Sequence, residues 1–414
     1  MEGDAPGGGG PGAGEEEEEA WFEEGDGEVV ADLDSDDDVP DDDLEDDDDE
    51  DGDAAMEAGA GPPPAVPPPG RDDAAASLAR HGDPVYAVAW SRTNADLVAT
   101  GGGDDRAFLW ELGSGRAVAL EGHTDSVACV AFSHVSAALA TGGMDGKVLV
   151  WDRAGRLQHK LEGPNNAVEW VAWHPKGEVL LAGSTDYTTW MWSASSGTYM
   201  QMFGGHGGPV TCGAFLPDGK SLVTGSADGT LKWWDPRTAQ CTHTFEGDFE
   251  FHEQMLTALD CHPDSNLVLT GGAEGRVCLV NLANRKVAAK LQGHADGVEA
   301  VGLCGTLPLA ASGGLDGKAF VWDLHTLQPR YALEHGAAVI KLRWHPAQPL
   351  LLTAALDGRV RVWDARSGAC LRTFEGHTMP ILDMAVSAAG DGILTGSDDK
   401  LAKVFKLKRS SRRW

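Results

Sequence analysis

Aromatic residues recur at a nearly constant spacing through most of this 414-residue chain. The steps between successive positions are 41, 41, 42, 46, 42, 41 and 42 residues, and the positions hold Trp110, Trp151, Trp192, Trp234, Val280, Trp322, Trp363 and Phe405. Such a period is typical of repeat proteins, in which one unit cannot bury its own apolar face and packs on its neighbours. The chain is therefore predicted to fold as an array of eight similar units.

Polar residues stand at fixed offsets from these positions. An acid precedes each of them by six residues, and a Ser or Thr precedes the acid by four residues in seven repeats. A His precedes the acid by 22 residues in six repeats and by 23 in the first. These residue types can form a hydrogen-bond relay that ties the loop before the first strand to a later turn. We predict complete relays in five repeats: His81, Thr100, Asp104 and Trp110; His123, Thr141, Asp145 and Trp151; His206, Thr224, Asp228 and Trp234; His294, Ser312, Asp316 and Trp322; His335, Thr353, Asp357 and Trp363.

The segments between the markers have the pattern of short strands. Val127–Phe132 and Val148–Trp151 are examples, and Asp-Gly turns join such segments. Four antiparallel strands per repeat make a blade, which predicts an all-β, eight-bladed propeller. The eighth repeat ends on its third strand, at 403–407, so we expect residues 77–80 to supply the missing strand and close the ring without a free sheet edge.

Dipeptides typical of one family accompany the repeats. Gly-His occurs at 122–123, 205–206, 293–294 and 376–377, and Trp-Asp at 151–152, 234–235, 322–323 and 363–364. With these pairs, residues 76–408 resemble the WD40 family, which implies a binding protein rather than an enzyme. Segments 101–112, 168–192 and 381–405 resemble a WD40 subfamily with an acidic N-terminal tail. Its fungal members imply a chaperone for a basic large-subunit ribosomal protein, and its animal members imply a cell-migration or signalling scaffold.

Besides the eighth repeat, which has Phe405 in place of Trp, two repeats depart from the relay pattern. The third has Pro164 and Ala182 in place of His and Thr, so its relay cannot form. The fifth has Glu274 and Val280 in place of Asp and Trp. Two interpretations stay open: these blades have drifted because the other relays suffice, or the freed loops of the third repeat contact a partner.

Charge is distributed very unevenly along the chain. Residues 1–70 contain 28 acids and no Lys or Arg, whereas the remainder contains 37 acids and all 32 bases. The composition predicts a disordered acidic and Pro-rich tail at 1–74, the propeller at 75–408 and a short basic tail at 409–414. Because binding to DNA or to a membrane surface needs a dense basic face, we expect a basic protein or peptide as partner. The C-terminal tail is the one expected contact for RNA, and it could equally be a nuclear import signal or a solubilising end.

An insertion of four residues, 248–251, separates Gly247 from His252. In WD40 proteins this position lies in a loop on the top face, between one blade's outer strand and the next blade's inner strand. Carboxylates there would pair with Lys or Arg and Phe rings would add apolar area, unless the Phe side chains tuck against the blade. We predict a ring of partner-binding residues on this face: Asp83, Tyr86, Asp125, Glu169, Asp248, Phe249, Glu250, Phe251, Glu253, Asp296, Glu299 and Asp398.

Signals for catalysis, metals and secretion are weak. The Gly-Lys pairs at 146–147, 219–220 and 317–318 lack the first Gly of a phosphate loop, and no zinc-protease or nucleophile-elbow motif occurs. Seven scattered Cys without a C-x-x-C pair indicate a reducing compartment, and no apolar run approaches a membrane span. We expect no enzyme activity, cofactor or metal, and a monomer in the cytoplasm, also nuclear if the basic tail is an import signal.

A second short motif leaves another function open. W-D-x-R occurs at 234–237 and at 363–366. It resembles the adaptor-binding signature of substrate receptors in cullin-type ubiquitin ligases. The principal hypothesis remains a chaperone or scaffold for a basic ribosomal-protein segment, and the ligase receptor is the alternative.

Overall fold

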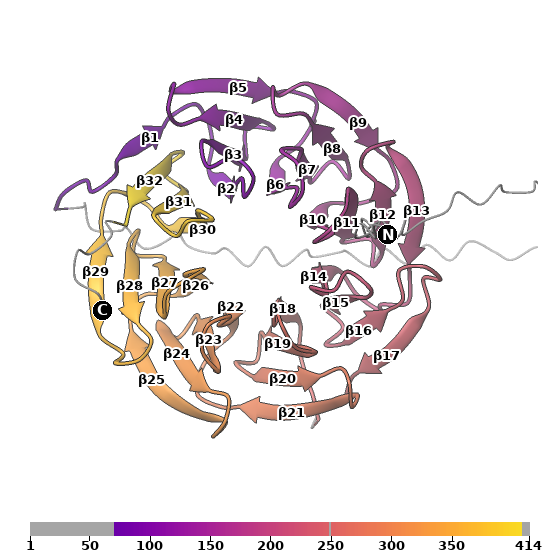
Figure 1. Ribbon diagram of the computed structural model, residues 1–414, viewed down its shortest axis with the longest axis vertical. Helices are drawn as coiled ribbons and strands as arrows, with labels where there is room; N and C mark the ends of the chain where they lie inside the picture. Colours follow the sequence, from indigo (N-terminus) through magenta and orange to yellow (C-terminus); the bar gives the residue numbers. More distant parts are fainter. Residues whose placement is uncertain (1–69, 248–249, 408–414) are drawn as a thin grey trace, which may run out of the picture. The chain divides into compact units, whose positions relative to one another are not determined.

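The computed structural model describes residues 70–247 and 250–407. Within them, 32 strands form eight four-stranded antiparallel sheets arranged around a ring (Figure 1). The prediction of an all-β, eight-bladed propeller is confirmed. Residues 1–69 of the predicted acidic tail, Asp248, Phe249 and the basic C-terminal tail lie outside the described residues.

Each blade is a meander whose first strand is innermost. From inner to outer, the strands are β2 (Val85–Trp90), β3 (Leu97–Gly102), β4 (Ala107–Glu111) and β5 (Arg116–Leu120) in blade one; β6 (Val127–Phe132), β7 (Leu139–Gly143), β8 (Val148–Trp151) and β9 (Leu157–Leu161) in blade two; β10 (Val168–Trp173), β11 (Val179–Ser184), β12 (Thr189–Ser193) and β13 (Thr198–Phe203) in blade three; β14 (Val210–Phe215), β15 (Leu222–Ser226), β16 (Leu231–Trp234) and β17 (Cys241–Phe245) in blade four; β18 (Leu256–Cys261), β19 (Leu267–Gly272), β20 (Val277–Asn281) and β21 (Lys286–Leu291) in blade five; β22 (Val298–Leu303), β23 (Leu309–Gly314), β24 (Lys318–Asp323) and β25 (Gln328–Glu334) in blade six; β26 (Val339–Trp344), β27 (Leu350–Ala355), β28 (Val360–Asp364) and β29 (Cys370–Phe374) in blade seven; and β30 (Ile381–Val386), β31 (Gly392–Ser397), β32 (Ala402–Lys406) and β1 (Ala76–Leu78) in blade eight.

The N-terminal strand closes the ring as predicted. Strand β1 pairs with β32, with Ala76 opposite Val404. Contacts with blade eight begin before this strand, because the Asp72 carboxylate lies 2.6 Å from Nζ of the buried Lys403. The Asp73 N–H also donates to the carbonyl of Glu375 at 2.8 Å. The segment that closes the ring therefore starts three residues before the boundary expected from composition.

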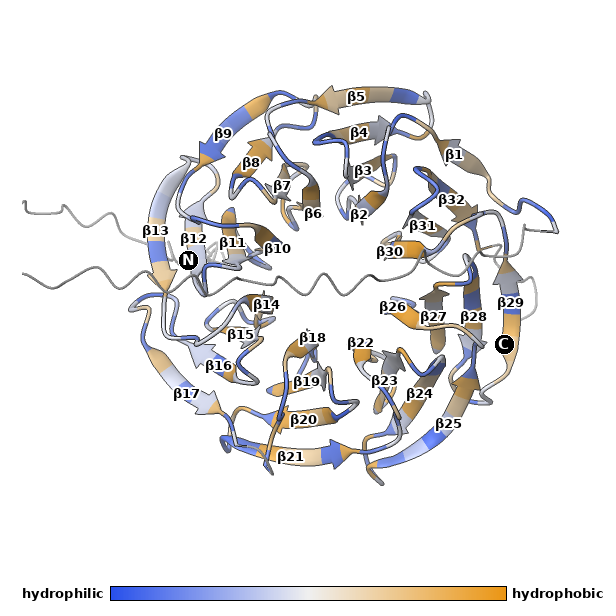
Figure 2. Cartoon of the chain, turned by 180° about the vertical axis from the view of Figure 1, so that it is seen from behind, coloured by the Kyte–Doolittle hydropathy of each residue, from blue (hydrophilic) through white to orange (hydrophobic). Residues whose placement is uncertain are grey.

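The core lies between neighbouring blades. One cluster joins Leu97 and Leu109 of blade one to Val127, Leu139 and Trp151 of blade two, and similar clusters occur around the ring. Figure 2 shows hydrophobic residues concentrated on inner strands such as β6, β26 and β30, while the outer strand β9 is more hydrophilic. Burying apolar area at every blade boundary stabilises the ring by about 25 cal/mol per Å².

Every inner strand carries a β-bulge at its second residue. In blade three, for example, the register shifts between Val168 and Trp170, so Glu169 has no ladder partner. The eight bulged residues are Tyr86, Ala128, Glu169, Thr211, Thr257, Glu299, Ile340 and Leu382. Because bulges re-aim side chains and locally end pairing, these residues mark one end of the ring. None of the described segments is a helix long and apolar enough to cross a membrane.

Candidate partner-binding face

One end of the propeller is built from two kinds of connection. Loops run from the outer strand of one blade to the inner strand of the next, and turns join the second and third strands. A backbone hydrogen bond ties turn to loop in every blade, as from the Gly103 N–H to the Pro84 carbonyl (2.9 Å) in blade one. We call this end the relay face. The predicted partner-binding residues in the described ranges come from its loops, its turns or the bulges.

Four blades contain the complete relay. In blade four the Trp234 Nε1–H donates to Thr224 Oγ1 at 2.8 Å, and the Thr224 hydroxyl donates to Nε2 of His206 at 2.7 Å. The His206 Nδ1–H donates to Asp228 at 3.1 Å, and the same carboxylate accepts the Gly207 N–H at 2.7 Å. Blades one, two and six have the same chain of bonds, which confirms the predicted relays there.

In blades two and six, the surroundings of the relay favour a neutral histidine and a charged aspartate. Burial lowers the pKa of His123 and His294, and their Asp partners offset this only in part. Burial alone would raise the pKa of Asp145, but hydrogen bonds from His123 and the Thr124 N–H outweigh it and lower the pKa below its usual value. These carboxylates already accept internal hydrogen bonds, so the relay is a structural device that shapes the loops.

The predicted relay in blade seven is wrong in one link. His335 Nε2 accepts the Thr353 hydroxyl at 2.7 Å and the Trp363 Nε1–H reaches the same oxygen at 2.9 Å, but the His335 Nδ1–H donates to the Leu333 carbonyl. The Asp357 carboxylate instead pairs with the Arg361 guanidinium at 2.6 Å. A guanidinium outcompetes a neutral imidazole for a carboxylate, so an Arg two residues before the Trp is the signal that sequence reasoning missed.

Blade three lacks its relay, as predicted, but it is not unstructured. The ring of Trp190 packs against Gly163, so it occupies space beside the loop where other blades place the relay His. Its Nε1–H donates to Thr188 Oγ1 at 2.7 Å, and that hydroxyl donates to Asp186. A substitute chain of hydrogen bonds therefore fixes the turn of this blade.

Blade five keeps part of its relay. His252 bonds Glu274 at 2.6 Å and Thr270 at 2.9 Å. The side chain of Val280 has no N–H to donate to Thr270, and the Thr270 hydroxyl donates to the Cys278 carbonyl. Burial favours the neutral form of Glu274, yet the hydrogen bond from His252 leaves its pKa lowered overall. The longer Glu side chain thus substitutes for Asp.

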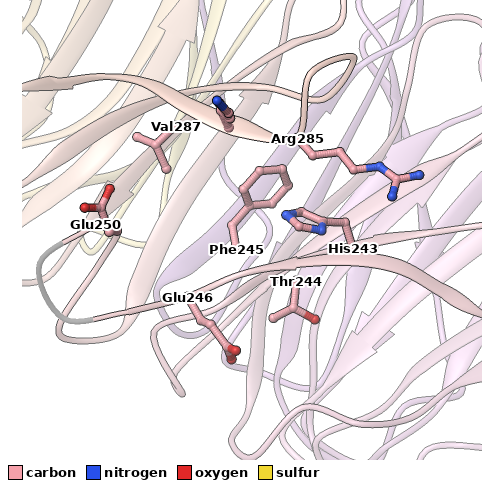
Figure 3. A pocket seen from close by; sticks show the side chains of 8 residues that line it. His243, Thr244, Phe245, Glu246, Glu250, Arg285 and Val287 are labelled. Atoms are coloured by element: carbon pink, nitrogen blue, oxygen red, sulfur yellow. The ribbon is translucent and has the colours of Figure 1, made fainter.

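The insertion before blade five divides into an outer and a buried part. Phe251 is fully buried, 6.3 Å from the ring of Phe245 and 4.5 Å from His252, so the prediction that it contacts a partner is wrong. Its side chain fills the boundary between blades four and five, which removes more apolar area from water than exposure would. Glu250 lies at the rim of an open pocket floored by Phe245 and bordered by Arg285 (Figure 3).

The other predicted acids lie on the relay face but are spread around it. Asp83 pairs with Lys400 at 3.3 Å and Glu253 with Arg276 at 2.6 Å. Other bases of the turns are paired in the same way, as Lys147 is with Asp145 at 3.0 Å. The remaining described residues of the predicted ring are Tyr86, Asp125, Glu169, Asp296, Glu299 and Asp398, all at least partly exposed. The cations of this face are therefore largely neutralised, which leaves an excess of negative charge.

Two of these acids lie at bulges of inner strands. Glu169 and Glu299 occupy the bulged position of β10 and β22, and no Lys, Arg or His of the described residues lies within 4.0 Å of either carboxylate. Burial raises the pKa of both carboxyls, and for Glu299 nearby Lys341 opposes this effect. An incoming cation would recover the electrostatic energy that partial burial costs.

Exposed apolar side chains accompany the acids. Half of the large exposed hydrophobic residues of the described chain lie on the relay face: Tyr86, Met144, Tyr187, Met255 and Leu315. The prediction included Tyr86 alone among these. The other four stand in turns or loops where most residues are polar. A large apolar residue within such a turn is the sequence signal that would have indicated them. Acids interleaved with apolar groups suit a basic peptide that also carries apolar side chains.

The repeats match a known family model over nearly the whole propeller. The WD domain, G-beta repeat model matches eight times, at residues 74–111, 116–152, 155–193, 197–235, 239–281, 285–323, 327–364 and 368–406. The chain belongs to the WD40 family. Its resemblance to that family, inferred above from Gly-His and Trp-Asp pairs, is thereby confirmed.

Individual WD40 proteins are similar over most of their length. The chain is 35% identical to human angio-associated migratory cell protein over 357 residues, 82% of each chain. It is 45% identical to a WD repeat-containing protein of Schizosaccharomyces pombe over 345 residues, 81% of this chain and 86% of that one. Among solved structures, Chaetomium thermophilum Sqt1 bound to the N-terminus of the ribosomal protein L10 has a TM-score of 0.75 at 26% identity, covering 81% of this chain and all of that one.

No three His, Cys, Asp or Glu side chains of residues 70–247 and 250–407 converge as metal ligands. The W-D-x-R arginine Arg366 hydrogen-bonds to Asp364 of its own motif at 3.2 Å, in a turn at the end opposite the relay face. The ligase-receptor alternative stays a prediction.

Proposed function

We propose that this WD40 protein is a chaperone that captures a basic segment of a large-subunit ribosomal protein on its relay face. The observation that carries the proposal is the similarity to Sqt1, whose structure holds the N-terminus of ribosomal protein L10. The charge and apolar character of the relay face support it, because a basic segment would find carboxylates and apolar surface together. Assembly of ribosomal subunits would place the protein in the cytoplasm and nucleus.

Charge reversal on the relay face tests the proposal. The probe is a fluorescent peptide of the N-terminal segment of ribosomal protein L10 from the same organism, titrated with the full-length protein at low and high salt. Glu169→Lys with Glu299→Lys is expected to weaken binding by tenfold or more, because each reversal turns an attraction into a repulsion. Asp218→Lys with Asp264→Lys is the matched control, since both residues are exposed in turns at the opposite end.

Two results would contradict the proposal. The first is a wild-type protein that does not bind the peptide, combined with a lysate pulldown that enriches no ribosomal protein. The second is equal loss of binding in the relay-face variant and the control, which would indicate non-specific attraction to an acidic protein rather than a defined face.

A further inference from the structure

Tyr187 has an unusual backbone conformation in the turn between β11 and β12. Its φ is +71°, in the left-handed region that bulky residues avoid. Five other blades place Gly at the corresponding position, with φ between 72° and 82°: Gly146, Gly229, Gly275, Gly317 and Gly358. A Tyr in this position therefore costs free energy that the usual Gly does not.

Two other blades also have a residue other than Gly at this position, and features of the chain account for both. Lys400 (φ 68°) donates from Nζ to the Gly82 carbonyl and pairs with Asp83 at 3.3 Å. Asp105 (φ 61°) is of a residue type that tolerates the left-handed region. Tyr187 has neither explanation, because its side chain is 48% exposed and makes no hydrogen bond or ring contact with any residue that the structure describes. No hydrogen bond or ring contact of the described residues therefore offsets this strain.

The surroundings of Tyr187 form one continuous part of the relay face. The loop 162–167 lies against two turns: Gly146, two residues after the exposed Met144, approaches the carbonyl of Asn166, and Asp186 accepts the Asn165 N–H at 2.9 Å. The turn of Tyr187 is also bonded to the carbonyl of Ala167, from Thr185 N–H at 3.0 Å. Glu169, at the bulge of β10, follows Ala167 by two residues.

The relay that blade three lacks belongs to this same part of the relay face, around Tyr187. Pro164 and Ala182 replace the relay His and Thr, while Trp190, Thr188 and Asp186 hold the turn by other bonds. Blade three has thus kept an ordered turn and an outward aromatic side chain although it lost the usual network. This favours the earlier interpretation in which its loops contact a partner over the one in which the blade has drifted.

We propose that Tyr187 and Glu169 form a subsite for one Arg or Lys side chain of the basic cargo. The aromatic ring offers its face to the cation, the unpaired carboxylate supplies the counter-charge, and Met144 on the far side of the loop contacts apolar atoms of the neighbouring cargo residue. The inference rests on the proposed function and names a residue that determines specificity within it.

The experiment compares Tyr187→Gly, Tyr187→Phe and Leu371→Ala in the full-length protein, with the same L10 peptide as probe. Tyr187→Gly is expected to weaken binding about three- to thirty-fold, while its midpoint of thermal unfolding is no lower than that of wild type because the strain is relieved. Tyr187→Phe keeps the ring and should bind as wild type does. Leu371, 37% exposed on the outer strand β29 of blade seven, is the control, and its truncation should leave binding unchanged.

A second set of peptides locates the cation. Each peptide has one Arg or Lys replaced by Gln, and binding is measured to wild type and to Tyr187→Gly. For one position the two losses should not add, which identifies the cation that meets Tyr187. If wild type binds and Tyr187→Gly binds equally tightly, or if every pair of losses adds, this inference is overturned while the proposed function stands. If wild type does not bind the peptide, both fall.

Discussion

Thr224→Val tests the free energy that one relay contributes to the propeller. Val matches the shape of Thr, but it removes the oxygen that accepts the Trp234 Nε1–H and donates to His206 Nε2. Thr224 and Trp234 are almost fully buried, so neither orphaned group can turn to water. Each of the two unsatisfied buried groups costs about 1–3 kcal/mol, which predicts a loss of about 2–6 kcal/mol in the free energy of unfolding.

The assay is urea unfolding followed by tryptophan fluorescence, with hydrogen exchange to locate the change in blade four. Thr270→Val in blade five is the matched control, because Thr270 bonds His252 but no Trp. It leaves one buried ring nitrogen without a hydrogen-bond partner instead of two, so the loss in free energy of unfolding should be about half as large. A loss below about 0.5 kcal/mol for Thr224→Val, or an equal loss for both variants, would refute the reasoning that the relay's buried hydrogen bonds stabilise the blade.

Three further predictions concern ring closure, pH and the buried insertion residue. Truncation before Gly70 should keep the wild-type melting temperature, whereas truncation after Leu78 should lower it by opening blade eight; equal melting temperatures would contradict the closure by β1. Burial lowers the pKa of His335 to about 4, so the unfolded chain binds more protons below pH 6.5 and stability should fall by up to about 3 kcal/mol between pH 6.5 and 4. A His335→Gln variant should lose that part of the pH dependence. If the stability of the variant keeps the pH dependence of wild type, His335 is not its source. Phe251→Ala should cost about 3–5 kcal/mol in urea unfolding, and a cost near zero would place its side chain outside the core.

The repeat pattern predicted the fold in detail because its markers are local. Each His, Thr, Asp and Trp belongs to one blade, so a fixed spacing along the chain becomes a fixed position in space. The relays of blades one, two, four and six follow directly. Blade seven differs because Arg361, which no relay offset includes, competes for Asp357.

The partner-binding residues were harder to predict. The acids are predicted from their charge and from their positions near the relay His and Asp, and the structure places them around the relay face with exposed apolar groups among them. Phe251 was assigned to the surface because an inserted loop suggests exposure, yet the space between blades four and five accommodates its ring. Tyr187 was passed over, since a backbone angle cannot be read from a single residue, although Gly at the equivalent position of five repeats was a signal.

The sequence by itself determined the number of blades, the closure of the ring by an N-terminal strand and the separation of a highly acidic segment from a nearly neutral propeller. These follow from period, pattern and composition, which act over short distances along the chain. The tertiary structure alone decided which carboxylates remain unpaired on the relay face, that Phe251 is core, and that Tyr187 stands outward in a strained turn. Those outcomes depend on which groups from different blades compete for the same few ångströms of space.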